Sequence, residues 1–358
     1  MSATRLHSII AQIIRDEGPM PVDRYMTLCL GHPEHGYYMK HDPIGEGGDF
    51  ITSPEISQIF GELIGVWCAT AYQAMGSPAE LNLIELGPGR GTLMTDLMRA
   101  AKVMPQFASS ARIHLVETSP MLRKIQEVTL GTEASWHTGL DAVPAGPGIV
   151  IANEFFDAIP IRQFESRDGR WMERCIGLDA EGRLTLGLVE YRCSWGPARQ
   201  GAIVERSPQR EAIARAVGAR LATCPGAALI IDYGHLKSAP GDTLQAVRNH
   251  QFCGILDHPG ESDLTAHVDF QSLHDALSVG GAAVHNPMTQ RQFLIAMGLE
   301  ARAAVLAGNA PPGQREIIDA AVERLAGESQ MGNLFKVIAA TTPGLPVAYP
   351  FGSNDRSS

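Results

Sequence analysis

A short apolar run, closed by an acidic residue and followed by alternating glycines, constrains this chain more than any other stretch. The run covers residues 81–86, and the glycines are Gly87, Gly89 and Gly91. An apolar run of this length is typical of a strand inside a parallel sheet, and glycines let the backbone turn sharply and approach a ligand closely. The stretch therefore predicts a strand, a tight turn and a helix, with a nucleotide-like ligand at the turn.

The glycine spacing and the residue before the loop distinguish two kinds of nucleotide ligand. The dinucleotide fingerprint is G-x-G-x-x-G, with a pyrophosphate at the helix N-terminus, whereas this loop, with Pro88 in its first gap, reads G-x-G-x-G. Glu85 stands just before the loop. A carboxylate there repels phosphate and attracts an ammonium or sulfonium group. The pattern favours S-adenosylmethionine as cofactor and leaves a nicotinamide oxidoreductase as the disfavoured alternative.

The next apolar run supplies a second acidic residue. It covers residues 112–117 and ends in Glu117. A carboxylate at the end of the neighbouring strand can accept both ribose hydroxyls, as the acidic residue of dinucleotide folds does. An ordinary strand-to-helix turn explains the glycine loop alone, but it does not explain Glu85 and Glu117 beside it.

Length and composition limit the number of domains, the kind of partner and the location that we expect. The chain has 358 residues, of which 44% are hydrophobic, enough for one large α/β domain with additions or for two domains. The net charge of −10 and the lack of clustered Lys and Arg argue against a nucleic-acid-binding surface. Six scattered cysteines without a C-x-x-C pair, and no apolar run near the roughly 18 residues of a membrane span, lead us to expect a cytoplasmic protein. The oligomeric state stays open.

Helical periodicity organises the N-terminal part. It predicts helices over residues 4–16 and 22–30, and a longer helix from Ser53, as N-cap, to about Met75. A polar, glycine-rich loop at residues 45–55 precedes the longer helix, and we interpret this loop as a lid over the cofactor. Thr52 and Ser53 at its end are predicted cofactor contacts.

From residue 81 onward the pattern alternates between strands and helices, as in a doubly wound sheet. Residues 160–195 interrupt this alternation with three strand-like runs, which predict an inserted antiparallel β-meander. We therefore predict an α/β fold, a doubly wound sheet with an inserted β-meander, and the late pair of strands is what a seven-stranded methyltransferase sheet would need. The expected parts are an N-terminal helical lid region (residues 1–76), the methyltransferase domain (77–345) and a flexible tail (346–358). Within the domain, residues 160–226 should form an insertion of meander and helix on the substrate side. The strands expected in the sheet are 81–86, 112–117, 148–152, 227–232, 282–285 and 334–340.

Residues 149–160 supply the predicted substrate site. Ligands of open α/β sheets bind beyond the carboxyl ends of the strands, where this segment places Asn153, Glu154 and Asp157. We expect Asn153 to face the methionine part of the cofactor. An arginine nucleophile is protonated at any working pH and needs carboxylates to fix its guanidinium group, so Glu154 and Asp157 are the catalytic candidates. The alternative is that these two carboxylates cap a helix after the strand.

A second polar cluster lies near the C-terminal third of the chain. Asp263, His267 and Asp269 have the residue types of a metal site, but they also suit a loop and an N-cap before a helix starting at residue 270. We predict no metal there. His267 is instead a catalytic candidate near the substrate entrance.

Taken together, six stretches resemble one known family. They are GDFITSPEISQIFGELIGVW, ELGPGRGTL, VETSP, ANEFFDAIP, IDYGH and DLTAHVDF. They resemble the MidA family of class I S-adenosylmethionine-dependent methyltransferases, which includes the mitochondrial complex I assembly factor. The resemblance extends from about Pro21 to Val337 and implies a Rossmann-like seven-stranded methyltransferase sheet with an N-terminal helical addition. It also implies cofactor binding by Gly87, Gly89, Gly91, Glu117 and Asn153.

The resemblance also implies an activity and a partner. For the mitochondrial members it implies dimethylation of an arginine in the large quinone-side subunit of complex I. The leading hypothesis is therefore a protein-arginine methyltransferase that aids assembly of a respiratory NADH dehydrogenase, with a protein substrate. The alternatives are a methyltransferase of small molecules and an assembly factor that binds the cofactor without catalysis.

Overall fold

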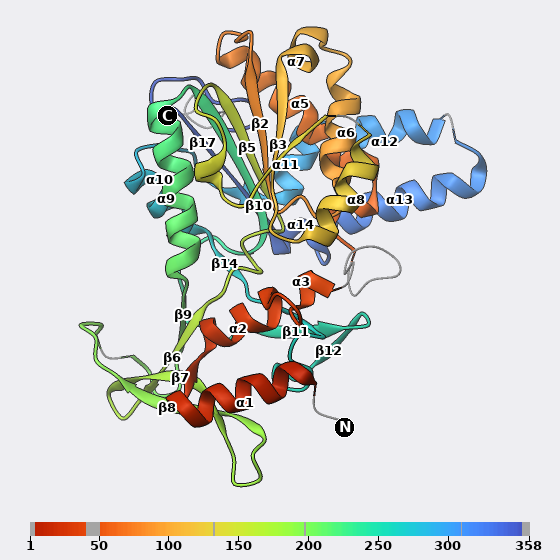
Figure 1. Ribbon diagram of the computed structural model, residues 1–358. Helices are drawn as coiled ribbons and strands as arrows, with labels where there is room; N and C mark the ends of the chain where they lie inside the picture. The colour runs from red at the N-terminus through yellow and green to blue at the C-terminus, as the bar shows by residue number, and fades with distance from the viewer. Residues whose placement is uncertain (1–3, 41–50, 132, 197, 309, 353–358) are drawn as a thin grey trace. The chain divides into compact units, whose positions relative to one another are not determined.

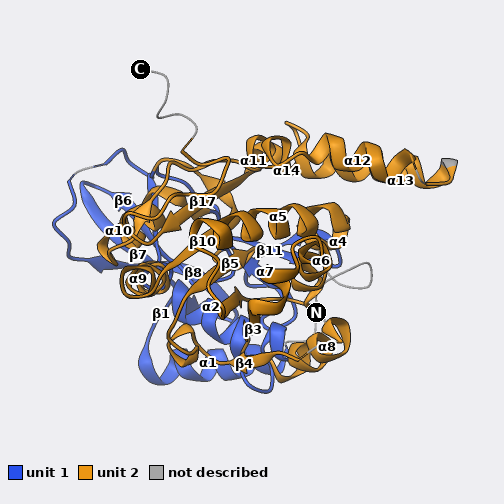
Figure 2. Cartoon of the chain, turned by 90° about the horizontal axis from the view of Figure 1, so that it is seen from above, with its two compact units in different colours: residues 1–50, 157–210, 238–267 blue, residues 51–156, 211–237, 268–358 orange. Residues whose placement is uncertain are grey.

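The computed structural model describes residues 4–40, 51–131, 133–196, 198–308 and 310–352. It contains two compact units, each assembled from three segments of the chain (Figure 2). Unit 1 comprises Met1–Phe50, Asp157–Arg210 and Ser238–His267, and unit 2 comprises Ile51–Phe156, Glu211–Lys237 and Val268–Ser358. Each unit has its own hydrophobic core.

Unit 2 is built on a mixed sheet with the strand order β15-β17-β10-β5-β2-β3-β4 (Figure 1). Strands β4, β3, β2, β5 and β10 pair in parallel, and β17 runs antiparallel to β10 and β15. Two short strands, β14 and β16, pair with β10 and β17. The predicted Rossmann-like sheet is confirmed. The bounds are β2 Leu81–Leu86, β3 Ala111–Val116, β4 Ser135–His137, β5 Gly148–Asn153, β10 Gly226–His235, β14 Val268–Asp269, β15 Ala283–Val284, β16 Met288–Thr289 and β17 Phe335–Thr341.

Both faces of this sheet are buried, because successive side chains of a strand point to opposite faces. Leu83 belongs to the core that includes residues of α5 and α6, and Ile84 to the core that includes residues of α9 and α10. These two pairs of helices lie on opposite sides of the sheet (Figure 1). The helices are α5 Gln58–Ala74, α6 Thr92–Ala101, α7 Pro105–Ser110, α8 Pro120–Leu130, η1 Leu140–Ala142, α9 Pro208–Thr223, α10 Phe270–Val279, α11 Gln290–Ala296, α12 Leu299–Gly308, α13 Pro312–Ala326 and α14 Met331–Leu334.

Among the parallel strands, the order changes direction once. From β2 the chain proceeds outward to β3 and β4, and it then returns to the other side of β2 to form β5 and β10. In open α/β sheets the ligand binds at such a switch point, beyond the carboxyl ends of the strands. The residues that follow β2 and β5 are therefore the ones placed to form a ligand site.

The helix expected from Ser53 to Met75 is two helices, α4 (Ser53–Ile56) and α5. Ser57 separates them with an extended backbone, at φ −161° and ψ 137°, and its side chain caps α5 by accepting from the Ile59 N–H at 3.3 Å. The predicted N-cap was also wrong by one residue, because Thr52 is the N-cap of α4 and Ser53 is its first helical residue. A serine that can cap a new helix competes with helix continuation.

Unit 1 combines three helices with antiparallel strands. The predicted helices near residues 4–16 and 22–30 are confirmed, and so is the antiparallel meander, formed by β6, β7 and β8. Apolar side chains of the first two helices share one core with residues such as Ile161, Ile176 and Leu264. The elements are α1 Arg5–Glu17, α2 Val22–Gly31, α3 Tyr37–Lys40, β1 Met20–Pro21, β6 Arg162–Arg167, β7 Arg170–Leu178, β8 Leu184–Tyr191, β9 Ile203–Arg206, β11 Gln245–Arg248, β12 Gln251–Cys253 and β13 Asp263–Thr265.

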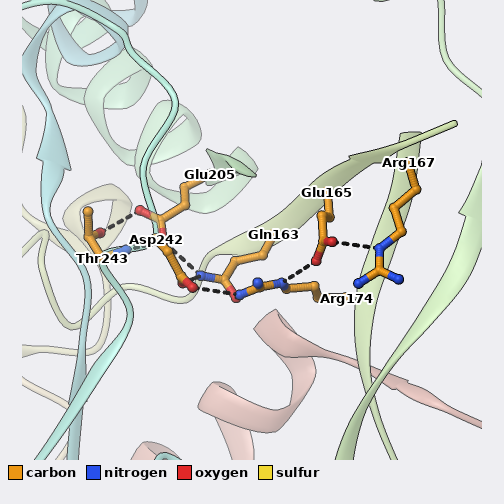
Figure 3. A network of polar contacts seen from close by, with 7 residues as sticks. All are labelled: Gln163, Glu165, Arg167, Arg174, Glu205, Asp242 and Thr243. Atoms are coloured by element: carbon orange, nitrogen blue, oxygen red, sulfur yellow. Dashed lines mark hydrogen bonds and ion pairs between the residues drawn. The ribbon is translucent and has the colours of Figure 1, made fainter. Parts of the chain in front are cut away.

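A polar network crosses this part of unit 1 (Figure 3). Arg174 of β7 pairs with Glu165 of β6 at 3.3 Å and with Asp242 at 2.9 Å. Gln163 of β6 donates to Glu205 of β9 at 2.8 Å and to Asp242 at 2.9 Å. The network ties two neighbouring strands of the meander to a segment that lies far along the chain.

The predicted flexible tail is packed over its first part. Ala348 and Phe351 are buried in the unit 2 core, and the Phe351 ring lies 6.0 Å from that of Phe293. Two apolar residues in a segment rich in proline and glycine gave too weak a signal to predict this packing. Residues 353–358 of the tail, and residues 45–50 of the predicted lid, lie outside the described residues.

Candidate active site

The glycine loop after β2 has a backbone that only glycine adopts readily. Gly87, Gly89 and Gly91 have φ values of 62°, 53° and 84°. A Cβ added to Gly87 would lie 2.6 Å from Cδ2 of Phe155, so no side chain fits there. Within the turn, the Pro88 carbonyl accepts from the Gly91 N–H at 2.8 Å. The loop thus leads into α6 with bare backbone, as close approach of a ligand requires.

Glu85 is a buried carboxyl group at the end of β2. Its side chain is 2% exposed, and burial raises its pKa to about 8. Its Oε2 atom has no hydrogen-bond partner among the described residues. A buried polar atom without a partner costs free energy. A cationic ligand group at this atom would recover that cost and favour the ionised form.

Glu117 follows the neighbouring strand β3. Its Oε1 atom accepts from the Ser119 N–H at 2.7 Å, and its Oε2 atom accepts from Gln126 Nε2 at 3.3 Å. Burial raises the pKa of Glu117, and these hydrogen bonds oppose the rise. Gln126 was not predicted as a site residue, because one glutamine within a helix forms no motif.

Asn153 is the last residue of β5, which lies on the other side of β2, and Glu154 follows it. Asn153 Nδ2 donates to Glu154 Oε1 at 3.1 Å, and the Ser53 N–H donates to the same oxygen at 2.7 Å. The Oδ1 atom of Asn153 and the Oγ atom of Ser53 are buried and have no partner in the part of the chain that the structure describes. Two predicted cofactor residues therefore hold the carboxylate of a predicted catalytic residue.

The backbone at Glu154 is in the left-handed region, with φ 50°. This conformation is uncommon for residues other than glycine and often marks a functional site. The buried Asp232 of β10 stabilises the turn, because its Oδ2 atom accepts from the N–H groups of Phe155 and Phe156 at 3.2 and 2.9 Å. Asp232 was not predicted as a site residue.

A side-chain hydrogen bond connects helix α4 to α6, the helix that follows the glycine loop. Thr92, the first residue of α6, donates its hydroxyl to Glu55 Oε1 at 2.5 Å. Thr52, the predicted cofactor contact, is the N-cap that precedes α4. The contact fixes the start of α4, and with it Ser53, beside the loop that ends at Gly91.

Asp157 and His267 lie in unit 1, where the structure brings their backbones together around Arg210. The Arg210 guanidinium donates to the carbonyl of Asp157 at 2.9 Å and to that of His267 at 2.7 Å. The Asp157 carbonyl also accepts from the Ala266 N–H at 3.1 Å. The alternative in which Glu154 and Asp157 cap a helix is wrong, because the chain passes from β5 to β6 without a helix.

The polar cluster near residue 267 is dispersed among structural contacts. Asp269 is the N-cap of α10 and accepts from the N–H groups of Gln271 and Ser272, and Asp263 accepts from the Tyr38 hydroxyl at 2.9 Å. Within the described ranges, no group of at least three His, Cys, Asp or Glu residues could hold a metal ion. Over the same ranges, no helix is long and apolar enough to cross a membrane.

The sheet order, the glycine loop and the acidic residues at the ends of β2 and β3 define a Rossmann-like methyltransferase. A family model of S-adenosyl-L-methionine-dependent methyltransferases matches residues 63–288. This match spans more than half of the chain, and the chain belongs to that family.

Known proteins agree with this assignment over nearly the whole length. The mitochondrial protein arginine methyltransferase NDUFAF7 homolog of Drosophila melanogaster is 38% identical, over 96% of this chain and 87% of its own. The human protein arginine methyltransferase NDUFAF7 is 35% identical, over 91% and 81%. A crystal structure from Burkholderia thailandensis, bound to S-adenosyl-homocysteine, has a TM-score of 0.84 at 29% identity, covering 96% of this chain and 93% of the other.

The site fits S-adenosylmethionine, the cofactor of this family. Glu85, Asn153 and Ser53 each present a buried polar atom without a partner among the described residues. The three glycines of the loop present backbone without side chains. Unmet hydrogen-bonding atoms next to such a loop are expected of a site whose partner is a polar ligand.

Proposed function

We propose that this protein methylates an arginine side chain of a protein substrate. The observation that carries the proposal is the likeness over at least 91% of this chain to relatives named protein arginine methyltransferases. We further propose that the substrate is a subunit of respiratory NADH dehydrogenase, the large quinone-side subunit of complex I, and that methylation aids its assembly. The curated relatives are mitochondrial by name, and for this chain we propose a cytoplasmic location.

The cofactor contacts that we propose divide into two groups. Glu85, Asn153 and Ser53 would hold the amino-acid part, because a carboxylate and neutral acceptors suit an ammonium group. Glu117 and the glycine loop, with Thr52 beside α4, would hold the nucleoside part. When bound, S-adenosylmethionine supplies a methyl group on a sulfonium, which is transferred by in-line displacement.

Glu154 has the geometry of a carboxylate that orients a guanidinium group. Its Oε1 atom is fixed by the Ser53 N–H and by Asn153, so the side chain is held in one orientation before substrate arrives. A carboxylate in fixed position localises the charge of an arginine and directs one nitrogen toward the methyl donor. We propose Asp157 as the second such carboxylate and His267 as a residue of the substrate entrance.

The proposal is tested by methyl transfer to proteins. The purified enzyme is incubated with S-adenosylmethionine carrying an isotopically labelled methyl group and an extract from cells that lack the enzyme. We expect label on arginine of one protein, detected by peptide mass spectrometry. The rate should fall at least about 100-fold in Glu154→Gln and Asp157→Asn, and it should be unchanged in Glu190→Gln, whose side chain is 53% exposed.

Other outcomes would contradict the proposal in distinct ways. Label confined to small molecules would indicate a small-molecule methyltransferase. No transfer to any acceptor, together with tight binding of S-adenosylhomocysteine, would indicate an assembly factor that binds the cofactor without catalysis. Label on an arginine outside NADH dehydrogenase would leave the arginine chemistry standing and refute the proposed partner.

A further inference from the structure

Gln126 of α8 links the two sides of the proposed nucleoside site. Its side chain is completely buried. Its Nε2 atom donates to the carbonyl of Gly89 at 2.7 Å and to Glu117 Oε2 at 3.3 Å. We infer that Gln126 is a positioning residue, which fixes the Glu117 carboxylate and the glycine loop relative to each other for cofactor binding. The inference rests on the proposed role of Glu117.

Trp136 of β4 determines which way the Gln126 amide faces. The indole Nε1–H donates to Gln126 Oε1 at 2.8 Å. An indole nitrogen can only donate, so the amide must turn its oxygen toward Trp136. The NH₂ group is therefore directed at Gly89 and Glu117, which both offer acceptors. The hydrogen-bond network specifies this orientation without reference to a ligand.

The same network leaves the Glu117 carboxylate little rotational freedom. Its Oε1 atom is held by the Ser119 N–H, and its Oε2 atom is held by Gln126. A carboxylate fixed at both oxygens presents its remaining acceptor positions in one direction. Ribose hydroxyls that bind there lose less free energy to ordering than they would at a mobile side chain. Since one amide serves both the carboxylate and the loop, displacement of either should disturb both.

The hydrogen bond from Gln126 also favours the ionised form of Glu117. Burial raises the pKa of Glu117, whereas the bonds from Ser119 and Gln126 lower it. Without the Gln126 donor, protonation of Glu117 should occur at a higher pH. A protonated Glu117 has one acceptor oxygen fewer for the ribose. The loss of cofactor affinity on acidification should therefore begin at a higher pH in a variant that lacks the donor.

Two substitutions separate the donor of Gln126 from its packing. Gln126→Glu keeps the shape of the side chain and an oxygen for Trp136, and in its ionised form it removes both donated bonds and adds a negative charge beside Glu117. Trp136→Phe keeps both donors and removes only the bond from the indole. We expect the Kd for S-adenosylhomocysteine, measured by calorimetry, to rise roughly 10- to 100-fold in Gln126→Glu and less than about 5-fold in Trp136→Phe.

A third variant and a double variant test the mechanism. In Gln126→Leu, the acid limb of the pH profile of binding should move to higher pH, an effect that loss of packing alone does not produce. The double variant Gln126→Leu with Glu117→Gln should lose less affinity than the product of the two single losses, because the two changes share the bond between Gln126 and Glu117. Thermal unfolding of each variant identifies any that fail to fold.

The outcomes distinguish this inference from the proposed site. Wild-type affinity in both Gln126 variants, or losses that multiply with that of Glu117→Gln, would overturn the positioning role. Wild-type affinity in Glu117→Gln would instead refute the proposed role of Glu117, on which the inference rests. Weakened binding in the Gln126 variants with an unshifted acid limb would assign Gln126 to packing alone.

Discussion

The polar network of unit 1 and the strand ends of the unit 2 sheet both bury polar side chains, but they satisfy them differently. In the network of unit 1, every charged side chain bonds to another side chain of the network (Figure 3). In unit 2, buried oxygens of Ser53, Glu85 and Asn153 have no partner among the described residues. The first arrangement stabilises the fold by itself. The second costs stability, and a polar ligand that completes the hydrogen bonds would recover that cost.

The difference gives a practical criterion for locating function in this molecule. Ionisable residues alone do not mark the site, because the polar network of unit 1 also contains several of them. What marks the site is the combination of burial, unmet hydrogen bonds and a backbone that only glycine adopts readily. If the criterion is right, substitutions at the strand ends of unit 2 should mainly weaken cofactor binding. Substitutions in the unit 1 network should mainly lower the free energy of unfolding.

The largest effect on binding is expected from Gly87→Val. The new side chain would overlap the Phe155 ring, and valine does not readily adopt the local φ of 62°. The Kd for S-adenosylhomocysteine should rise by at least about 100-fold, measured by calorimetry. Gly313→Ala is the matched control, since a Cβ there meets nothing within 4 Å. Retained affinity in Gly87→Val would show that the ligand does not depend on the shape of this loop.

Glu85→Gln is expected to have a smaller effect on binding and also to change the stability of the ligand-free protein. Without the carboxylate, the Kd for S-adenosylhomocysteine should rise roughly 10- to 100-fold. The stability of the ligand-free protein should change in the opposite direction. Because burial raises the pKa of Glu85 from 4.5 to about 8, the folded state binds a proton that the unfolded state has lost. Wild-type stability therefore falls as the pH rises between these values.

The pH dependence gives the measurement for Glu85. Glu85→Gln abolishes this titration, so the variant should unfold at about the wild-type denaturant concentration at pH 4. At pH 9 it should be more stable by up to about 4 kcal/mol. Parallel stability profiles for the two proteins from pH 4 to 9 would show that Glu85 is not held protonated in the folded state.

The smallest effect on binding, and a clear effect on stability, is expected from Arg174→Met in unit 1. The Arg174 side chain is 17% exposed and pairs with Glu165 and Asp242. Its removal leaves both carboxylates without this partner, so the free energy of unfolding should fall by about 1–3 kcal/mol in urea denaturation. The Kd for S-adenosylhomocysteine should stay within about 2-fold of wild type.

Arg183→Met is the control for the unit 1 network. Arg183 also pairs with an acidic residue, Asp179, but its side chain is 72% exposed. Its removal should cost less than about 1 kcal/mol. A large loss of cofactor affinity in Arg174→Met would break the contrast between the two units.

The sequence could predict those parts of the fold that depend on local pattern. The runs that became β2, β3, β5 and β10 are apolar because both faces of the sheet are covered, and each was long enough to be recognised. Strand β4 has only three residues, and so short a run cannot show the alternation of side chains that identifies a strand. It was missed, although its Trp136 orients Gln126.

The grouping of segments into two units could not be derived from local pattern. Strand β1 has only two residues, and Met20 pairs with Ile176 of β7 far along the chain. Pairing over such a separation depends on the folded structure. The boundaries predicted at residues 76 and 345 stay predictions, whereas the structure divides the chain at residues 50, 156, 210, 237 and 267.

The candidate site was predictable to the extent that it follows strand ends. Glu85, Glu117 and Asn153 were found because an acidic or amide residue closes an apolar run. Gln126 and Asp232 were not found as site residues, because both act on the backbone of other segments, and such contacts leave no spacing in the sequence. Glu154 was found by its position, but its left-handed backbone could not have been foreseen.

The position of β17 has a consequence for synthesis of the protein. This strand comes last in the chain, yet it lies between β15 and β10 and pairs with β10 over seven residues. On the ribosome, β10 is complete about 100 residues before β17 emerges, an interval of roughly 5 to 20 s at common elongation rates. During that time one edge of an apolar strand has no partner strand. Exposed edges of this kind invite intermolecular pairing, so a nascent chain that pauses between residues 235 and 335 should be especially prone to aggregate.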